Sequence, residues 1–133
     1  MEQKDYMLRE IEKIGLILSS IRQKILGGPD NLAISQEKQI DDVKSMLLSE
    51  LNFDLEKFIS LDNEEFNKYL SNFDGFNIEN IERLAECISQ IGQNNKSEEY
   101  LNKALQLYVF CNIKSKTFSF EREEKIVSIK NAL

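Results

Sequence analysis

The 133-residue chain has no histidine, no tryptophan, a single proline and only two cysteines. The missing histidine removes the commonest general base, together with Ser/His and Cys/His nucleophile pairs. Two cysteines without histidine also cannot complete a four-ligand zinc site. We therefore expect no catalytic residue of these classes, no metal and no cofactor.

The five glycines form no phosphate-binding loop. The segment GGPDN at 27–31 lacks the Lys-Ser/Thr pair of a P-loop, and no strand precedes it. The adjacent carboxylates Asp41–Asp42 and Glu64–Glu65 are neighbours that point to different sides of a helix, so neither pair suits acid/base catalysis. The sequence predicts a protein that is not an enzyme.

No stretch approaches the roughly 18 apolar residues of a membrane span. The N-terminus MEQKDYMLRE also lacks a basic region followed by an apolar segment, which is typical of secretory leaders. We expect a cytoplasmic protein that contacts no membrane. The length and the 41% hydrophobic content predict a single domain over 1–133, with an N-terminal helical part at 1–76 and a second part at 77–133.

The net charge of -6 is unevenly distributed. Residues 50–86 hold ten acidic and three basic residues, whereas 96–133 holds five acidic and seven basic ones. No basic stripe is present that could neutralise several phosphates, so nucleic-acid binding is not expected. Cys87 and Cys111 are expected on consecutive helices at levels about 15 Å apart, which predicts two buried free thiols.

The N-terminal region predicts a long helix from Lys4 to Leu26, stopped by GGP at 27–29. Its apolar residues alternate spacings of four and three: Met7, Ile11, Ile14, Leu18, Ile21 and Ile25. Leu8, Gly15 and Ile17 widen this stripe into a face suited to packing on a core. The alternative is self-association through one part of the seam: Ile11, Ile14, Leu18 and Ile21.

The middle of the chain predicts a helix capped by Ser35 and two short helices within 52–61 and 62–73, the last with a capping box of Asp62 and Glu65. No segment shows the period-two alternation of a strand. The expected fold is therefore an all-α, multi-helix domain.

A helical hairpin is the strongest local prediction. Asn77 is a suitable first N-cap, Gly92 a suitable terminator and Ser97 a suitable second N-cap. Apolar or small residues recur along it at helical spacing: Ile81, Leu84, Ala85, Ile88, Leu101 and Ala104. This pattern resembles one tetratricopeptide repeat. Ser97 replaces the usual alanine and Val109 the usual proline, and no second copy precedes the hairpin.

The resemblance implies a concave face lined by Glu79, Glu82, Glu86 and Ser89. This acidic face lacks the family's lysine and asparagine clamp for a terminal carboxylate, and its sign suits a basic or polar partner segment. A single repeat cannot bury its own faces, so the first helix and a last helix capped by Ser119 are expected to cover it. That last helix is expected to bury Phe120, Ile126 and Val127, with Ile129 or Leu133 as further candidates. One or both rings of Phe118 and Phe120 are expected to seal its junction with the hairpin.

The start MEQKDYMLREIEKIG and the end ALQLYVFCNIKSKTFSFEREEKI together resemble a family of small uncharacterised bacterial proteins. The resemblance implies a bacterial, all-helical protein and no particular activity. The favoured function is a non-enzymatic domain that binds a protein partner or itself. The alternative is a small-molecule-binding protein or enzyme with an aromatic pocket lined by Phe58, Tyr69, Tyr100 and Tyr108.

Overall fold

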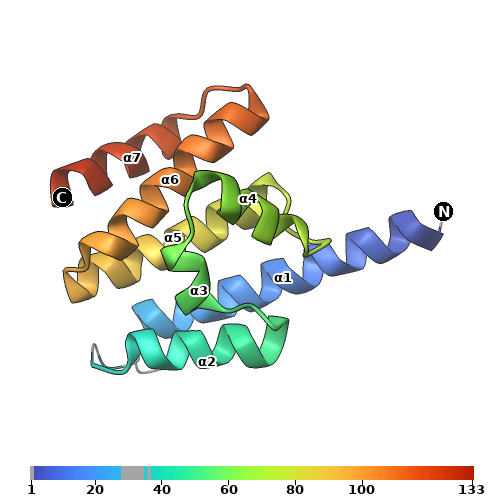
Figure 1. Cartoon of the computed structure of the whole chain (residues 1–133), viewed down its shortest axis with the longest axis horizontal. Helices are drawn as coiled ribbons and strands as arrows, with labels where there is room; N and C mark the ends of the chain where they lie inside the picture. The colour runs from blue at the N-terminus through green and yellow to red at the C-terminus, as the bar shows by residue number, and fades with distance from the viewer. Residues whose placement is uncertain (1, 28–34, 36) are drawn as a thin grey trace.

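The computed structural model describes residues 2–27, 35 and 37–133, with side chains from Lys4 onward (Figure 1). Its helices are α1 (Glu2–Leu26), α2 (Gln39–Leu51), α3 (Leu55–Ser60), α4 (Asn63–Ser71), α5 (Ile78–Asn95), α6 (Glu98–Ser115) and α7 (Phe120–Ala132). The described residues contain no strand, so the all-α prediction is confirmed.

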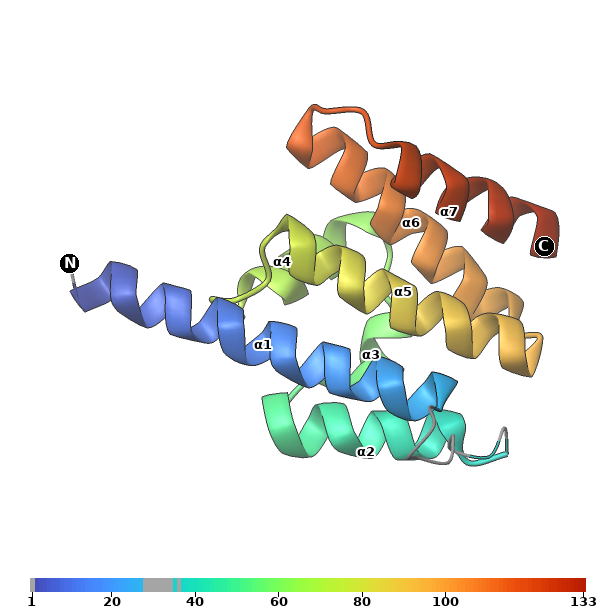
Figure 2. The ribbon, with the colours of Figure 1, turned by 180° about the vertical axis from the view of Figure 1, so that it is seen from behind.

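The α5–α6 hairpin forms the centre of the molecule. Helix α1 packs against α5, and α7 packs against α6, as Figure 2 shows from behind. Helix α2 lies against α1, and α3 contacts both α2 and α6. The prediction that the two terminal helices cover the hairpin is therefore confirmed.

Side-chain caps begin most of these helices. The predicted caps Asp62, Asn77, Ser97 and Ser119 each accept a backbone N–H in the first turn of their helix. The prediction for Ser35 is wrong, because α2 begins at Gln39 and its N-cap, Lys38, makes no side-chain cap bond. Ser35 instead accepts the Lys38 N–H through its backbone carbonyl (2.9 Å), in the turn before the helix.

Gly92 does not end α5 as predicted. The helix continues to Asn95, and Lys96 closes it in the left-handed conformation (φ 52°). Gly92 matters for packing instead, because a Cβ there would lie 2.9 Å from Leu101 Cγ on α6. In the predicted GGP terminator, Gly27 takes a left-handed φ of 76°, while Gly28 and Pro29 lie outside the described residues.

The inner half of α1 belongs to the core. Ile14, Leu18, Ile21 and Ile25 are at most 2% exposed. Three of these had been candidates for a self-association face, and that alternative is wrong for Ile14, Leu18 and Ile21 because they already pack inside the chain. Ile11, at the edge of the packed region, is half-buried.

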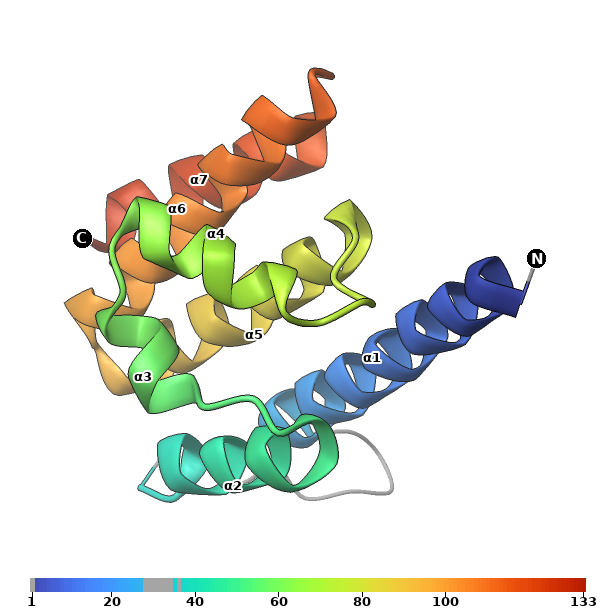
Figure 3. The same ribbon diagram turned by 45° about the vertical axis from the view of Figure 1, so that its right-hand side comes forward.

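The N-terminal end of α1 extends beyond the other helices (Figure 3). Every residue from Lys4 to Arg9 is exposed. The exposed and the packed parts of α1 meet near Ile11. There the buried Asn80 of α5 donates from Nδ2 to the carbonyls of Ile11 (2.9 Å) and Gly75 (2.7 Å). Gly75 lies so close to α1 that a Cβ would stand 2.5 Å from the Glu10 carbonyl oxygen.

Helix α7 buries a different stripe from the one predicted. Its inward residues are Arg122, Ile126 and Ile129, spaced four and three apart on one helical face. Ile126 was predicted, and Ile129 had been an open possibility. Phe120 and Val127 were predicted to be buried, but 78% and 52% of their surface is exposed because they lie on other faces of α7.

Candidate functional site

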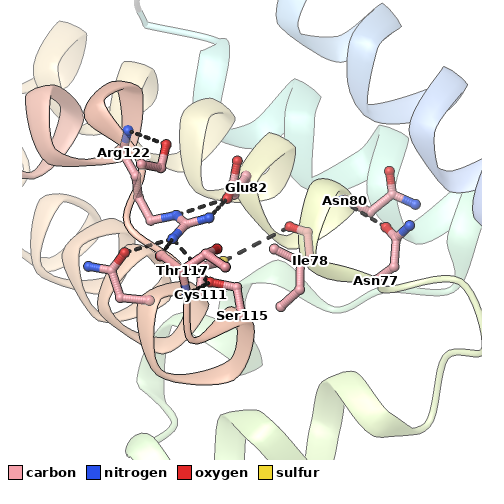
Figure 4. Close-up of polar contacts among 10 residues, drawn as sticks. Asn77, Ile78, Asn80, Glu82, Cys111, Ser115, Thr117 and Arg122 are labelled. Atoms are coloured by element: carbon pink, nitrogen blue, oxygen red, sulfur yellow. Dashed lines mark hydrogen bonds and ion pairs between the residues drawn. The ribbon is translucent and has the colours of Figure 1, made fainter.

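The predicted acidic face of α5 is largely paired with basic residues of the same chain. Glu82 Oε1 accepts hydrogen bonds from Arg122 Nη2 (2.5 Å) and Nε (2.9 Å), as Figure 4 shows. The third Arg122 nitrogen, Nη1, donates to Asn112 Oδ1 at 2.7 Å, with longer contacts to Ser115 and Thr117. The buried guanidinium of Arg122 therefore joins α5, α6 and α7.

The other members of that face are also occupied. Glu86 lies 2.5 Å from Arg22 of α1 and 3.8 Å from Lys125 of α7. Glu79 is exposed, 3.9 Å from Arg83, and Ser89 is buried. A basic partner would have to displace these internal cations, which weakens the charge argument for this face as a binding site.

A cleft of about 210 Å³ remains between α5 and α7, lined by acidic and basic residues together: Glu79, Glu82, Arg83, Glu86, Glu121, Arg122 and Lys125, with Tyr108 of α6. Burial raises the pKa of the Tyr108 hydroxyl above its ordinary value, and nearby Glu86 and Glu82 raise it further. The cleft therefore has a mixed charge pattern, and its tyrosine is not activated as a nucleophile.

The aromatic pocket predicted from Phe58, Tyr69, Tyr100 and Tyr108 is not formed. Phe58 is completely buried and packs against Tyr69 at a centroid distance of 5.9 Å. The Tyr69 hydroxyl accepts the backbone N–H of Asp54 (2.8 Å). Tyr100 is buried near the start of α6, and Tyr108 faces the α5–α7 cleft. Phe58 and Tyr69 therefore pack together in the core, while Tyr108 lines a different cleft.

An apolar hollow lies between α4 and α6, on a face that the sequence analysis did not identify. We call it the α4–α6 groove: Asn63, Phe66, Leu105, Gln106, Val109, Phe110 and Ile113, enclosing about 330 Å³. A second hollow of about 360 Å³, between α4 and the start of α5, adjoins it through Phe110. Of the described residues lining the two hollows, none is acidic and Lys114 alone is charged.

The sequence signal for this groove is a second apolar stripe on α6. Leu105, Val109 and Ile113 recur every four residues and therefore share one face of the helix. Val109 and Ile113 are 42% and 69% exposed, whereas Ala104, Leu107 and Cys111, on the opposite face of α6, are buried. Sequence reasoning noted Val109 only as a departure from the repeat pattern.

Lys103 lies beneath the groove and is the least expected buried residue. Its ammonium group lies 5.2 Å from the ring centre of Phe66 and 5.8 Å from that of Phe58. Nζ donates to the Leu61 carbonyl oxygen and to Gln106 Oε1 (2.8 Å). Desolvation lowers the pKa of Lys103, although Asp62 and Glu99 oppose the shift. Through the bond to Leu61, Lys103 joins α6 to the α3–α4 junction.

Two exposed aromatic rings lie where the α6–α7 loop meets the start of α7. Phe118 and Phe120 are 69% and 78% exposed and pack edge to face with centroids 4.9 Å apart. The prediction that they seal the junction of hairpin and last helix is wrong. The Arg122 network closes that junction instead, because its polar contacts span the same three helices.

Both cysteines are free and buried, as predicted. Burial raises the pKa of each thiol to about 12, so neither is a reactive thiolate at neutral pH. Within the described part of the chain, no group of three or more cysteine or carboxylate side chains is arranged to hold a metal ion. No helix among the described residues is both long and apolar enough to cross a bilayer.

No protein-family model, curated protein or solved structure matches the chain.

Proposed function

We propose that the protein is a non-enzymatic interaction domain that binds a helical segment of another protein in the α4–α6 groove. The observation that carries the proposal is the exposed apolar stripe of α6 beside a hollow lined by Phe66 and Phe110. Contiguous apolar surface that a folded chain leaves uncovered often marks a binding site. The tetratricopeptide-like character of the hairpin and a cytoplasmic location remain predictions beside this proposal.

The shape and chemistry of the groove favour a helix as its occupant. Its floor is formed by two helices, and an amphipathic helix binds such a groove through apolar side chains spaced three and four residues apart. The amides of Asn63 and Gln106 lie among its lining residues and offer polar contacts at the edge. Lys114 lines the adjoining hollow.

Charge indicates what the partner helix carries beside its apolar face. The chain is acidic overall, yet acidic side chains are missing from the lining of both hollows. A partner with glutamate or aspartate flanking its apolar stripe would meet Lys114 and no opposing carboxylate there. We therefore propose a partner helix with neutral or acidic flanks, which replaces the basic partner expected for the α5 face.

A designed peptide tests the proposal directly. The probe is a helix of about four turns with leucine at positions i, i+4 and i+7 and glutamate beside them. Titration into the ¹⁵N-labelled protein is expected to shift the amide signals of α4 and of Leu105–Lys114. The variant Val109→Gln with Ile113→Gln is expected to weaken binding at least tenfold, because both anchors lose apolar contact.

Two controls make this result specific. Leu48→Gln removes a side chain that is 55% exposed on α2, away from the groove, and should leave binding unchanged. A peptide with lysine in place of every glutamate should bind more weakly. If the groove variant binds as tightly as wild type, or if the shifts map to the α5–α7 cleft, the groove is not the site.

A further inference from the structure

We propose that Gln106 determines which partners the α4–α6 groove accepts, because its side-chain NH2 group donates to a glutamate or aspartate carboxylate of the partner helix. This role rests on the function proposed for the groove, and it names the group that the partner must present there. It follows from how the Gln106 amide is held and from what surrounds it.

Lys103 fixes the orientation of the Gln106 amide. The Lys103 side chain is buried, and its Nζ donates to Gln106 Oε1 at 2.8 Å and to the Leu61 carbonyl oxygen. An ammonium group donates hydrogen bonds and accepts none, so only the amide oxygen of Gln106 can face it. The NH2 group of Gln106 therefore points away from Lys103.

The NH2 group of Gln106 is left without a partner of its own chain. Gln106 is half-buried and lines the groove one helical turn before Val109 and Phe110, its neighbours on the same face of α6. No hydrogen bond within the described part of the chain uses its Nε2 atom. Since no buried side-chain nitrogen of the described residues lacks a partner, Nε2 is accessible to solvent. A molecule that fills the groove would cover it.

Asn63, the other amide that lines the groove, differs from Gln106. Its side chain is exposed at the start of α4, and no hydrogen bond among the described residues fixes which end of the amide faces the hollow. Asn63 can therefore turn to offer either a donor or an acceptor, and it excludes no partner. Gln106 offers donors alone.

A partner that covers Gln106 must supply an acceptor. An N–H group that is buried without one lowers affinity by about fivefold or more, so an apolar or basic residue at this point is disfavoured. Hydrogen bonds to an ionised acceptor are roughly twice as strong as neutral ones. The Lys103 ammonium lies behind the amide, and no described residue lining the groove is acidic. Both features favour a carboxylate over a neutral oxygen.

Two peptides measure this selection. The first is the glutamate-flanked helix described above, and the second has alanine in place of every glutamate. Isothermal titration calorimetry with the full-length chain gives the ratio of their affinities, and wild type should prefer the glutamate peptide. In Gln106→Met, which removes the donors and keeps a similar volume, this preference should shrink at least fivefold.

Gln106→Glu is the sharper variant. It keeps nearly the same shape and an oxygen that can face Lys103, but it offers the partner no N–H group. The preference for the glutamate peptide should be lost or reversed, since two carboxylates would then meet. Gln23→Glu adds the same charge at an exposed position of α1 that does not line the groove, and it should leave the preference as in wild type.

The outcomes separate the role of Gln106 from the groove itself. If amide shifts place the glutamate peptide in the groove but both Gln106 variants keep the wild-type preference, Gln106 selects nothing and the proposed function stands. If wild type binds both peptides equally, selection of a carboxylate is likewise excluded. If wild type binds neither peptide, the groove is not a binding site and the role of Gln106 is wrong with it.

Discussion

Helices α5 and α6 are equally long, at 18 residues each, but differ in what surrounds them. Helix α5 lies between α1 and α6, and apart from Ile78 every side chain that it leaves unburied is polar. Helix α6 contacts α5, α7 and α3, yet Val109 and Ile113 remain exposed. The apolar residues of α5 are therefore all used by the fold, whereas α6 has more than its own chain covers.

This difference suggests a division of roles along the hairpin. Residues that face the core should determine stability and have no direct part in binding, while the outer stripe of α6 should do the reverse. Substitutions chosen from the two helices can separate these roles, because their effects on unfolding and on peptide binding are measured independently.

The largest effect is expected for Leu84→Ala in α5. Leu84 is completely buried between packed helices, so truncation removes apolar contacts and leaves a cavity that the neighbours cannot fill. We expect a loss of about 3 kcal/mol in the free energy of unfolding. Urea denaturation followed by circular dichroism measures it. Leu105→Ala on the outer stripe of α6 removes the same atoms and should lower the free energy of unfolding by less. An equal loss would contradict the proposed difference between core residues of α5 and outer residues of α6.

Arg122→Met should have the next largest effect, because it removes the polar connection between α5 and α7. The side chain is 6% exposed, and methionine keeps much of its volume while losing the contacts with Glu82, Asn112 and Thr117. Since Glu82 remains partly exposed, its uncompensated charge is partly solvated, and we expect a loss of about 2 kcal/mol.

Hydrogen exchange locates that loss. Amides of α7 should exchange faster in Arg122→Met than in wild type, while those at the centre of α5 should change only as much as global stability does. Glu82→Gln retains an acceptor and should cost less. Equal acceleration throughout the chain would show that Arg122 supports the whole core rather than α7.

The thiols extend the comparison to alkaline pH, with Cys87 on α5 and Cys111 on α6. Both have a folded-state pKa raised to about 12 from an ordinary 9.0. Between these pH values the unfolded chain releases thiol protons that the folded chain keeps. The contribution of the thiols to the free energy of unfolding is therefore fully present below pH 9 and is lost as pH rises toward 12. At pH 10 the expected loss is on the order of 1 kcal/mol per thiol.

Denaturation at pH 8 and pH 10 checks this expectation. Cys87→Ala and Cys111→Ala should each lower stability at pH 8 but reduce its further loss at pH 10. Tyr100, whose pKa burial raises to about 12, contributes to the same alkaline slope, so the double cysteine variant should retain part of it. A slope unchanged by both substitutions would assign the alkaline loss to the tyrosines.

Much of the fold could be predicted from the sequence, because the patterns that indicate helices and their ends involve residues close together in the chain. Helical spacing and cap residues identified the hairpin and the cover supplied by the terminal helices, since both depend on residues a few positions apart. The boundary at Gly92 was missed because its lack of a side chain serves close packing with Leu101, a contact between helices that spacing alone does not show.

The candidate site was harder to predict than the fold. The sequence predicts a free acidic face at Glu82 and Glu86, but the cations that pair with them come from distant parts of the chain, at Arg22 and Arg122. The exposed stripe of α6 was visible as a spacing of four, yet a helix with apolar residues on several faces does not reveal which face its own chain leaves uncovered. Only the packing of α4 and α7 resolves that question.

The smallest effect on stability is expected for Ile113→Gln. The isoleucine side chain is already 69% exposed, so little apolar surface returns to water on substitution. Glutamine also has a slightly higher helix propensity than isoleucine. We expect the free energy of unfolding to change by less than about 0.5 kcal/mol. If the same substitution weakens binding of the glutamate-flanked peptide, Ile113 serves recognition rather than folding, because stability and affinity then respond to different residues of the hairpin. A loss above about 1 kcal/mol would instead place Ile113 in the core and remove the distinction between α5 and α6.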